Sequence, residues 1–419
     1  MKNFFNFSEK ITAASKAALE KAKTKFDEID SVAEYNQQKV LSAFINNRVS
    51  ETDFAGSTGY GYGDTGREKL DRIYADIFGA EDAIVRHSFT CGTHTLAVAL
   101  FGVLRPGDTM LCVTGTPYDT IHSVIGLSGS RMGSLKDFGV NYEQVDLDSN
   151  GLPDMAAIEK ALEMKPKMVY IQRSRGYSLR HSLSVAEIGE IAKLVHSNCD
   201  AVVMVDNCYG ELVEKIEPTD VGADLMAGSL IKNAGGSIAR TGGYIAGRAD
   251  LVELCAYRAT TPGLGKEVGC TLGENRNMFM GIFHAPHVVG ESLKAAVFAA
   301  ALFENFGFKV TPASDESRHD IIQALCLENA DRLVEFCRGI QSGAPVDSYV
   351  TPEPWDMPGY DSKVIMAAGA FILGSSIELS ADAPLREPFA VWMQGGINFH
   401  SAKTAIMLAA QGLEEKGLI

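Results

Sequence analysis

The 419-residue sequence lacks the features that mark several large classes of protein. It contains no apolar run approaching the ~20 residues that a membrane-spanning helix needs. The N-terminus leads directly into the charged pair Glu9 and Lys10, without the apolar segment and cleavage site of a secretory signal, so we expect no such signal. No internal repeat and no low-complexity linker interrupts the sequence.

Basic residues are also scarce, since 38 Lys and Arg face 53 Asp and Glu, for a net charge of −15. This balance disfavours non-specific nucleic-acid binding, and we expect no nucleic-acid or membrane partner. The eight cysteines form no Cys-x-x-Cys pair and no zinc-spaced cluster, a pattern typical of the reducing cytoplasm. His284 and His287 have no further ligand at suitable spacing, so we expect no metal site.

Short apolar runs alternate with helix-like segments from about residue 79 to residue 250. This alternation predicts a mostly parallel sheet between layers of helices, an α/β fold. Residues 8–46 read as a long helix, and a second helix over 67–78 follows a Gly/Tyr-rich loop. A further helix is expected over 185–196. The expected strands are 83–86, 110–113, 142–145, 168–172, 202–206, 225–230 and 244–246.

The last third of the chain predicts a smaller α+β unit. Residues 275–303 read as one or two helices interrupted near Pro286, and a helix is expected over 401–413. The expected strands of this unit are 345–350, 363–367 and 376–379. We therefore divide the chain into an N-terminal helical segment (1–55), a large α/β domain (56–270), connecting helices (271–304) and a small C-terminal domain (305–419).

The most informative residues are an aspartate and a lysine 232 − 206 = 26 positions apart. Asp206 ends the apolar run AVVMVD, which is typical of a strand buried on both faces of a parallel sheet. Lys232 lies in the Gly/Ser-rich segment GSLIKNAGGS. Pyridoxal phosphate chemistry needs this combination, because a lysine forms a Schiff base with the cofactor and a carboxylate keeps the pyridine nitrogen protonated. Alone, either residue would equally fit an ordinary turn.

A helix start in the segment RHSFTCGTHT supplies a candidate phosphate site. Gly92 permits close backbone approach, Thr93 adds a hydroxyl, and free N–H groups at a helix start bind phosphate. Ser229, three positions before the lysine, offers another hydroxyl. Tyr118, in the segment TGTPYDTI, is placed to stack on a pyridine ring. Alone, the first segment would fit a simple helix cap and the second a Pro-Tyr turn, but their order along the chain favours the cofactor.

This order, Gly92-Thr93, Tyr118, Asp206 and Ser229-x-x-Lys232, resembles the fold-type-I pyridoxal phosphate enzymes of the cystathionine/methionine lyase group. The segments GYGYGDTGR, PYDT, VDNCYGELV and TPGLGKE are closer still to one branch. That branch is the cystathionine β-lyase-like, or methionine γ-lyase-like, proteins named for aluminium resistance. The resemblance covers nearly the whole chain. It implies the PLP-dependent transferase (aminotransferase, fold type I) fold and a homodimer, or dimer of dimers, with shared active sites.

The resemblance also assigns roles to individual residues. Lys232, Tyr118 and Asp206 are implied as catalytic, and Tyr60 and Tyr62 match a Tyr-x-Arg segment that reaches the neighbouring subunit's cofactor. The residues implied in cofactor binding are Lys232, Asp206, Gly92, Thr93, Tyr118, Ser229, Cys91, Tyr60, Tyr62 and Arg67.

Two positions of the family pattern are less well matched. No arginine follows two positions after Tyr60 or Tyr62, so the phosphate arginine is left open. Arg386 is the best match for the arginine that binds the substrate carboxylate. The alternatives for the phosphate arginine are Arg67, Arg240 and Arg258.

The thiols of Cys91 and Cys208 are expected to fill small spaces in the core.

The implied activity is that of a pyridoxal phosphate-dependent carbon–sulfur lyase acting on a sulfur-containing amino acid. The substrate amine would replace Lys232 on the cofactor through an external aldimine, and freed Lys232 would remove the α-proton to leave an α-carbanion. A leaving group would then depart from the β- or γ-carbon, with Tyr118 or Lys232 moving the extra proton of a γ-elimination. Two alternatives stay open. One is another fold-type-I reaction, such as transamination, aldol cleavage or desulfuration, and the other is a cofactor-binding protein without turnover.

Overall fold

The computed structural model describes residues 4–129, 132–356 and 362–419. The chain forms two compact units, one of residues 35–285 and the other combining 1–34 with 286–419. The division falls inside two long helices, α1 (Glu9–Asn46) and α8 (Asn275–Asn305), whereas the sequence pattern predicts boundaries at residues 55, 270 and 304. In the described part of the chain, no helix is long and apolar enough to cross a membrane.

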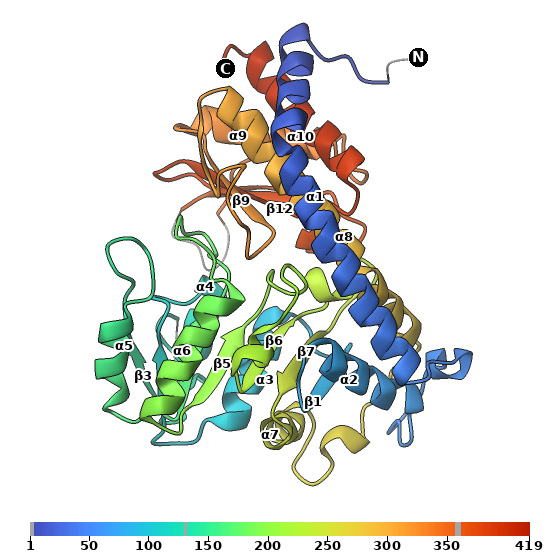
Figure 1. Ribbon diagram of the computed structural model, residues 1–419, viewed down its shortest axis with the longest axis vertical. Helices are drawn as coiled ribbons and strands as arrows, with labels where there is room; N and C mark the ends of the chain where they lie inside the picture. The colour runs from blue at the N-terminus through green and yellow to red at the C-terminus, as the bar shows by residue number, and fades with distance from the viewer. Residues whose placement is uncertain (1–3, 130–131, 357–361) are drawn as a thin grey trace. The chain divides into compact units, whose positions relative to one another are not determined.

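The larger unit is built on a seven-stranded sheet of order β1-β7-β6-β5-β4-β2-β3 (Figure 1). Only β7 runs against the others, because β1 and β6 both pair with it antiparallel while the remaining neighbours are parallel. The predicted mostly parallel α/β fold is therefore confirmed. The strands are β1 (Asp82–Arg86), β2 (Thr109–Cys112), β3 (Asn141–Gln144), β4 (Met168–Gln172), β5 (Val202–Asp206), β6 (Leu225–Ser229) and β7 (Gly243–Gly247).

The central strands are apolar on both faces because helices cover both. Val202 and Met204 of β5 join an apolar cluster with residues of helices α3 and α7. On the opposite face, the ring of Tyr244 in β7 packs against Tyr74 and Phe78 at helix α2 and its C-cap. The helices of this unit are α2 (Thr65–Ile77), α3 (Gly92–Val103), α4 (Asp119–Ile125), α5 (Met155–Leu162), α6 (Val185–Asn198) and α7 (Ala249–Ala259), with the beginning of α8 and the end of α1.

The smaller unit contains a five-stranded antiparallel sheet of order β10-β11-β12-β9-β8. Helices α9 (Ala330–Ser342) and α10 (Phe399–Glu415) pack against each other, and α9 also contacts β10 and β11. Buried side chains of the sheet, both helices and the second part of α8 share one apolar cluster. The strands are β8 (Lys309–Thr311), β9 (Ile322–Cys326), β10 (Val364–Ala367), β11 (Ser380–Pro384) and β12 (Ala390–Gln394).

Three predictions for this part of the chain need correction. Residues 345–350 form bends and a turn rather than a strand, and the side chain of Tyr349 is exposed, so no strand that the structure describes covers the segment. Residues 376–379 hold the short 3-10 helix Ser376–Glu378, and the strand begins only afterwards. Helix α8 continues through Pro286 without interruption. A proline removes one backbone donor, a loss that the buried apolar residues on both sides of it offset.

Candidate cofactor site

The carboxyl ends of β2, β4, β5 and β6 meet at one edge of the large sheet, because these strands are parallel neighbours. Asp206 is the last residue of β5, and in the register it pairs with Gln172 of β4 and Ala227 of β6. Lys232 follows the end of β6 by three residues. The fold therefore brings the predicted lysine and aspartate to adjoining strand ends. They lie at the edge of the sheet where ligands of open α/β sheets bind.

Asp206 is buried, with two donors at its carboxylate. Its Oδ1 accepts the backbone N–H of Cys208 at 3.1 Å, and its Oδ2 accepts the Tyr170 hydroxyl at 3.3 Å. Burial raises the pKa of Asp206, while the Lys232 ammonium and the two hydrogen bonds act in the opposite direction. A carboxylate held in this way favours a positive partner nearby, as the predicted contact with a pyridinium nitrogen requires.

Lys232 is partly buried among polar and aromatic side chains. Its Nζ lies 4.1 Å from the centre of the Tyr209 ring. Burial favours the neutral amine, but Cys208, Tyr209, Asp206 and Tyr118 outweigh it and raise the pKa of Lys232 well above its usual value. Without a covalent partner the amine is therefore protonated at neutral pH. Tyr209 was not singled out in the sequence, where it is one of several residues in a turn after a strand.

The turn that carries Lys232 is fixed from two sides. The Asn233 side chain donates from Nδ2 to the carbonyl oxygens of Tyr209 and Glu211, both at 3.0 Å. The Tyr74 hydroxyl donates to the carbonyl oxygen of Ala234 at 3.0 Å. Because Asn233 adjoins Lys232, these bonds fix the segment after β6 to the segment after β5. Asn233 and Glu211 are buried polar residues whose role the sequence pattern did not reveal.

The predicted phosphate cradle is also assembled at this edge. Helix α3 begins at Gly92, and a β-carbon built on Gly92 would lie 3.3 Å from Cβ of Ser229 and 3.7 Å from Sγ of Cys208. Gly92 therefore keeps the helix start open beside the Ser229 hydroxyl. The Thr93 hydroxyl lies 2.8 Å from that of Thr120. The free N–H groups of the α3 N-terminus and these hydroxyls suit an anion such as phosphate.

The two cysteines of this region differ. Cys208 is buried, as predicted, and burial raises the pKa of its thiol well above the usual value. The core-filling prediction for Cys91 is wrong, because Cys91 is exposed and caps helix α3, its Sγ accepting the His94 backbone N–H at 3.4 Å. The thiol is thus engaged with the backbone of the first helical turn and is not packed in the apolar core.

Tyr118 is positioned by the end of β4. Its backbone N–H donates to Oε1 of Gln172 at 2.6 Å, and its ring lies 5.8 Å from that of Tyr177. A β-carbon built on Gly176 would lie 3.2 Å from the Tyr118 ring, so the loop after β4 supports the ring edge. Tyr118 is half-buried. Its stacking on a cofactor ring stays a prediction.

Tyr60 and Tyr62 lie on the loop before α2, with their side chains 71% and 61% exposed and stacked at 5.4 Å. Arg67 differs from its expected role, since it is only 1% exposed. Its guanidinium donates to the carbonyl oxygens of Gly61, Gly269 and Glu267 at 2.9, 2.6 and 3.3 Å. Arg67 therefore stabilises the loop of its own chain, and its side chain would have to leave these acceptors to reach a phosphate.

Arg240 and Arg258, the other candidates for the phosphate, have side-chain partners of their own. Arg240 is exposed and forms an ion pair with Glu274. Arg258 lies 5.1 Å from the centre of the Phe101 ring. Arg386 belongs to the smaller unit, where it is exposed in the turn between β11 and β12. Its contact with a substrate carboxylate stays a prediction.

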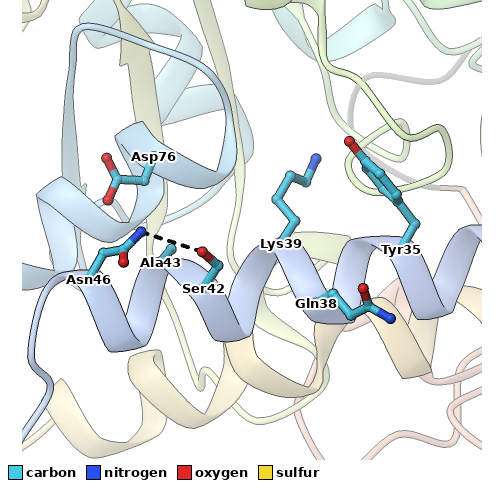
Figure 2. A pocket seen from close by; sticks show the side chains of 7 residues that line it. All are labelled: Tyr35, Gln38, Lys39, Ser42, Ala43, Asn46 and Asp76. Carbon is cyan, nitrogen blue, oxygen red and sulfur yellow. Dashed lines mark hydrogen bonds between the residues drawn. The ribbon is translucent and has the colours of Figure 1, made fainter.

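A hollow of about 300 Å³ lies elsewhere on the larger unit, along the second part of α1 (Figure 2). Its polar side chains include both a cation and an anion, and the Lys39 ammonium donates to the Lys215 carbonyl oxygen at 3.1 Å. No residue of the Lys232 site lines it. The lining residues are Tyr35, Gln38, Lys39, Ser42, Ala43, Asn46 and Asp76.

The residues at the sheet edge fit pyridoxal phosphate. Lys232 supplies an amine, Asp206 a buried carboxylate, and the α3 N-terminus with Ser229 an anion cradle that a β-carbon at Gly92 would fill. In the described residues, no group of three His, Cys, Asp or Glu side chains is arranged to hold a metal ion. This fold and this arrangement of residues are typical of the lyases and transferases that carry pyridoxal phosphate on a lysine.

Comparison with known proteins names the family. The chain belongs to the methionine gamma-lyase family, whose model matches residues 11–414. It is 48% identical over 394 residues to the uncharacterized protein YnbB of Bacillus subtilis, a match covering 94% of each chain. A carbon-sulfur lyase involved in aluminum resistance from Clostridium novyi is 50% identical, with a TM-score of 0.93 over 97% of this chain and 96% of that one.

A structure from Clostridium acetobutylicum, provisionally named a cystathionine beta-lyase involved in aluminum resistance, is 48% identical, with a TM-score of 0.95. The match covers 97% of this chain and 96% of the Clostridium acetobutylicum chain. The resemblance identified from the sequence motifs and the fold that it implied are therefore both confirmed.

Proposed function

We propose that the protein is a pyridoxal phosphate-dependent carbon–sulfur lyase that acts on a sulfur-containing amino acid. The observation that carries the proposal is the placement of Lys232, Asp206 and Tyr118 at adjoining strand ends, beside the anion cradle at Gly92. Membership of the methionine gamma-lyase family supports it. When bound, the cofactor supplies an electron sink for a negative charge on the substrate α-carbon.

The residues at the sheet edge divide the work. The Asp206 carboxylate holds a proton on a ring nitrogen placed beside it, because a buried carboxylate favours a positive neighbour. The α3 N-terminus, with Gly92 and Ser229, orients the phosphate group. Lys232 Nζ, displaced from its covalent bond as the neutral amine, takes the α-proton of the substrate as a general base and then returns a proton at the leaving position as a general acid.

We further propose a homodimer, alone or doubled, as the working assembly. The exposed pair Tyr60 and Tyr62 supports this, because two stacked tyrosines on a loop present an aromatic surface without a covering element of their own unit. In a symmetric dimer the same patch recurs on both subunits, so each loop can contribute to its partner's site. Arg67 holds the loop in shape and is not part of the proposed contact.

The test combines cofactor attachment with product formation. The purified protein is mixed with pyridoxal phosphate, reduced with borohydride and digested, and the cofactor mass is expected on the peptide containing Lys232. L-cystathionine, L-methionine and L-cysteine are then screened for 2-oxo acid release, with Lys232→Ala as the inactive control. Cofactor on another lysine would overturn the site assignment. Attachment at Lys232 without 2-oxo acid from any of the three amino acids would overturn the lyase assignment.

A further inference from the structure

A second aromatic side chain, Tyr209, lies against the reactive amine. Lys232 Nζ is 4.1 Å from the centre of its ring, a distance at which a cation and a ring face attract each other. Both side chains are partly buried, so solvent weakens the contact less than at an open surface. Tyr118, the tyrosine predicted to stack on the cofactor, comes from a different strand end.

The backbone holds Tyr209 in this place at some conformational cost. Its φ is +72°, in the left-handed region that bulky residues seldom adopt. The turn after β5 is closed by the Gly210 N–H, which donates to the Asn207 carbonyl oxygen at 2.9 Å. The Asn233 side chain holds the Tyr209 carbonyl oxygen at 3.0 Å. One turn thus places the Asp206 carboxylate and the Tyr209 ring near Lys232, and the residue after Lys232 fixes that turn.

We propose that Tyr209 is a positioning residue whose ring face holds the Lys232 ammonium whenever the free amine carries a proton. The inference rests on the proposed function for its catalytic meaning, because a lyase needs the freed amine to stay beside the substrate while it carries a proton. The ring face, rather than the hydroxyl, is the feature that the 4.1 Å contact identifies. The titratable groups around Lys232 are Cys208, Tyr209, Asp206, Tyr118 and Glu211.

The first test measures the pKa of the Lys232 amine in the full chain, freed of cofactor. The rate of trace acetylation of Lys232 is followed against pH by mass spectrometry, with exposed Lys23 as an internal reference. Tyr209→Phe keeps the ring and is expected to leave the pKa within a few tenths of the wild-type value. Tyr209→Leu is expected to lower it by about one pH unit, as the loss of a partly buried cation–ring contact predicts. Tyr257→Leu, on helix α7, is the matched control and is expected to change nothing.

A second test decides the inference even if the Tyr209→Leu variant does not fold. Phenylalanine carrying one, two or three ring fluorines is placed at position 209, which preserves shape while withdrawing charge from the ring face. The Lys232 pKa is expected to fall stepwise with fluorine number. A flat series, an unchanged pKa in folded Tyr209→Leu, or a phenylalanine variant that behaves like the leucine variant would each overturn the inference.

Catalysis gives the last readout. In the cofactor-loaded enzyme, Tyr209→Leu is expected to lower kcat about tenfold with KM little changed, and Tyr209→Phe to remain near wild type.

Failure of this inference is distinct from failure of the proposed function. If the wild type takes no cofactor on Lys232, the assignment of the cofactor site falls and the acetylation comparison still decides the role of Tyr209. If cofactor binds but the pKa does not move, only Tyr209 is excluded.

Discussion

At the residue scale, two buried carboxyl groups near Lys232 have different surroundings. Asp206 receives donors at both carboxylate oxygens, from the Cys208 backbone and the Tyr170 hydroxyl. Glu211 receives the Tyr244 hydroxyl at one oxygen, at 3.0 Å, while its Oε2 is buried and has no hydrogen-bond partner among the described residues. An ion is better supported where both oxygens are satisfied. We therefore expect Asp206 to act as the anion of the site and Glu211 to be neutral at pH 7.

Asp206→Asn is the substitution that tests the anion. The amide keeps the shape but cannot hold a proton on a ring nitrogen, so cofactor binding should persist while kcat falls by about 100-fold. Cofactor content is measured by absorbance after gel filtration, and kcat from 2-oxo acid release. An unchanged kcat would show that Asp206 is not the partner of the ring nitrogen.

Glu211 provides a prediction about pH and stability. Burial raises the pKa of Glu211 from 4.5 to about 8. The folded state therefore binds one more proton than the unfolded state between these values, and stability falls as the pH rises through that window. Glu211→Gln should remove this contribution, flattening the change in unfolding free energy from pH 5.5 to pH 8.5 by about 3 kcal/mol.

Urea unfolding followed by circular dichroism at the two pH values measures the effect of Glu211→Gln. Exposed Glu163, substituted in the same way, is the control and should leave the pH dependence as in the wild type. The quantity compared is the change of the unfolding free energy with pH. A buried amide at position 211 destabilises the protein equally at both pH values, so its effect cancels from that change. If Glu211→Gln retained the wild-type slope, the buried carboxyl would be ionised in the folded state.

At the scale of elements, the start of helix α3 makes a prediction about the phosphate. Gly92→Ala would place a methyl group 3.3 Å from Cβ of Ser229, inside the proposed cradle. We expect the dissociation constant for pyridoxal phosphate to rise about tenfold, as the loss of roughly 1.4 kcal/mol of phosphate contacts implies. Gly290→Ala on helix α8 is the control, because its methyl group would meet Ala33 Cβ at a similar 3.2 Å outside the cradle.

Titration of each protein with pyridoxal phosphate, followed by absorbance or tyrosine fluorescence, measures this difference. Both variants should keep the wild-type circular dichroism spectrum. Equal affinities of Gly92→Ala and wild type for pyridoxal phosphate would show that the phosphate does not bind at the α3 N-terminus.

The sequence predicted elements well where burial on both faces left long apolar runs. β4 and β5 begin and end where expected, because their residues are apolar throughout and end in a polar residue. In the smaller unit the patterns were weaker. Residues 345–350 contain apolar side chains that no strand in the described part of the chain covers, and β9 and β12 were not predicted. Their pairing depends on partners distant in sequence, which local pattern does not encode.

The site shows the same division. Asp206 and Lys232 were predictable because each follows an apolar run with a chemically distinctive residue. Tyr209 and Asn233 were not, because their roles depend on two turns from different strands meeting at the sheet edge. Arg67 was given a cofactor role from its place in a motif, whereas its burial and its three carbonyl acceptors emerge only from the folded loop.

At the scale of the whole molecule, the proposed dimer predicts that one chain cannot complete a site alone. Tyr60 and Tyr62 are exposed, and the loop that carries them is fixed by Arg67 rather than free to fold back. If the loop serves a partner's cofactor, then a subunit with an intact lysine and a subunit with an intact loop can together make one working site.

Complementation tests this directly. Lys232→Ala protein, inactive by loss of the amine, is mixed with a Tyr60→Ala/Tyr62→Ala variant that leaves Arg67 intact, under conditions of demonstrated subunit exchange. Each mixed dimer then contains one site with both the lysine and the tyrosines. In an equal mixture about half of random dimers are mixed, and each of these has one intact site out of two. Activity should therefore return toward one quarter of the wild-type value. Unmixed variants measured in parallel give the baseline. Exchange without recovered activity would show that each loop serves its own subunit, because a site complete within one chain gains nothing from a mixed partner.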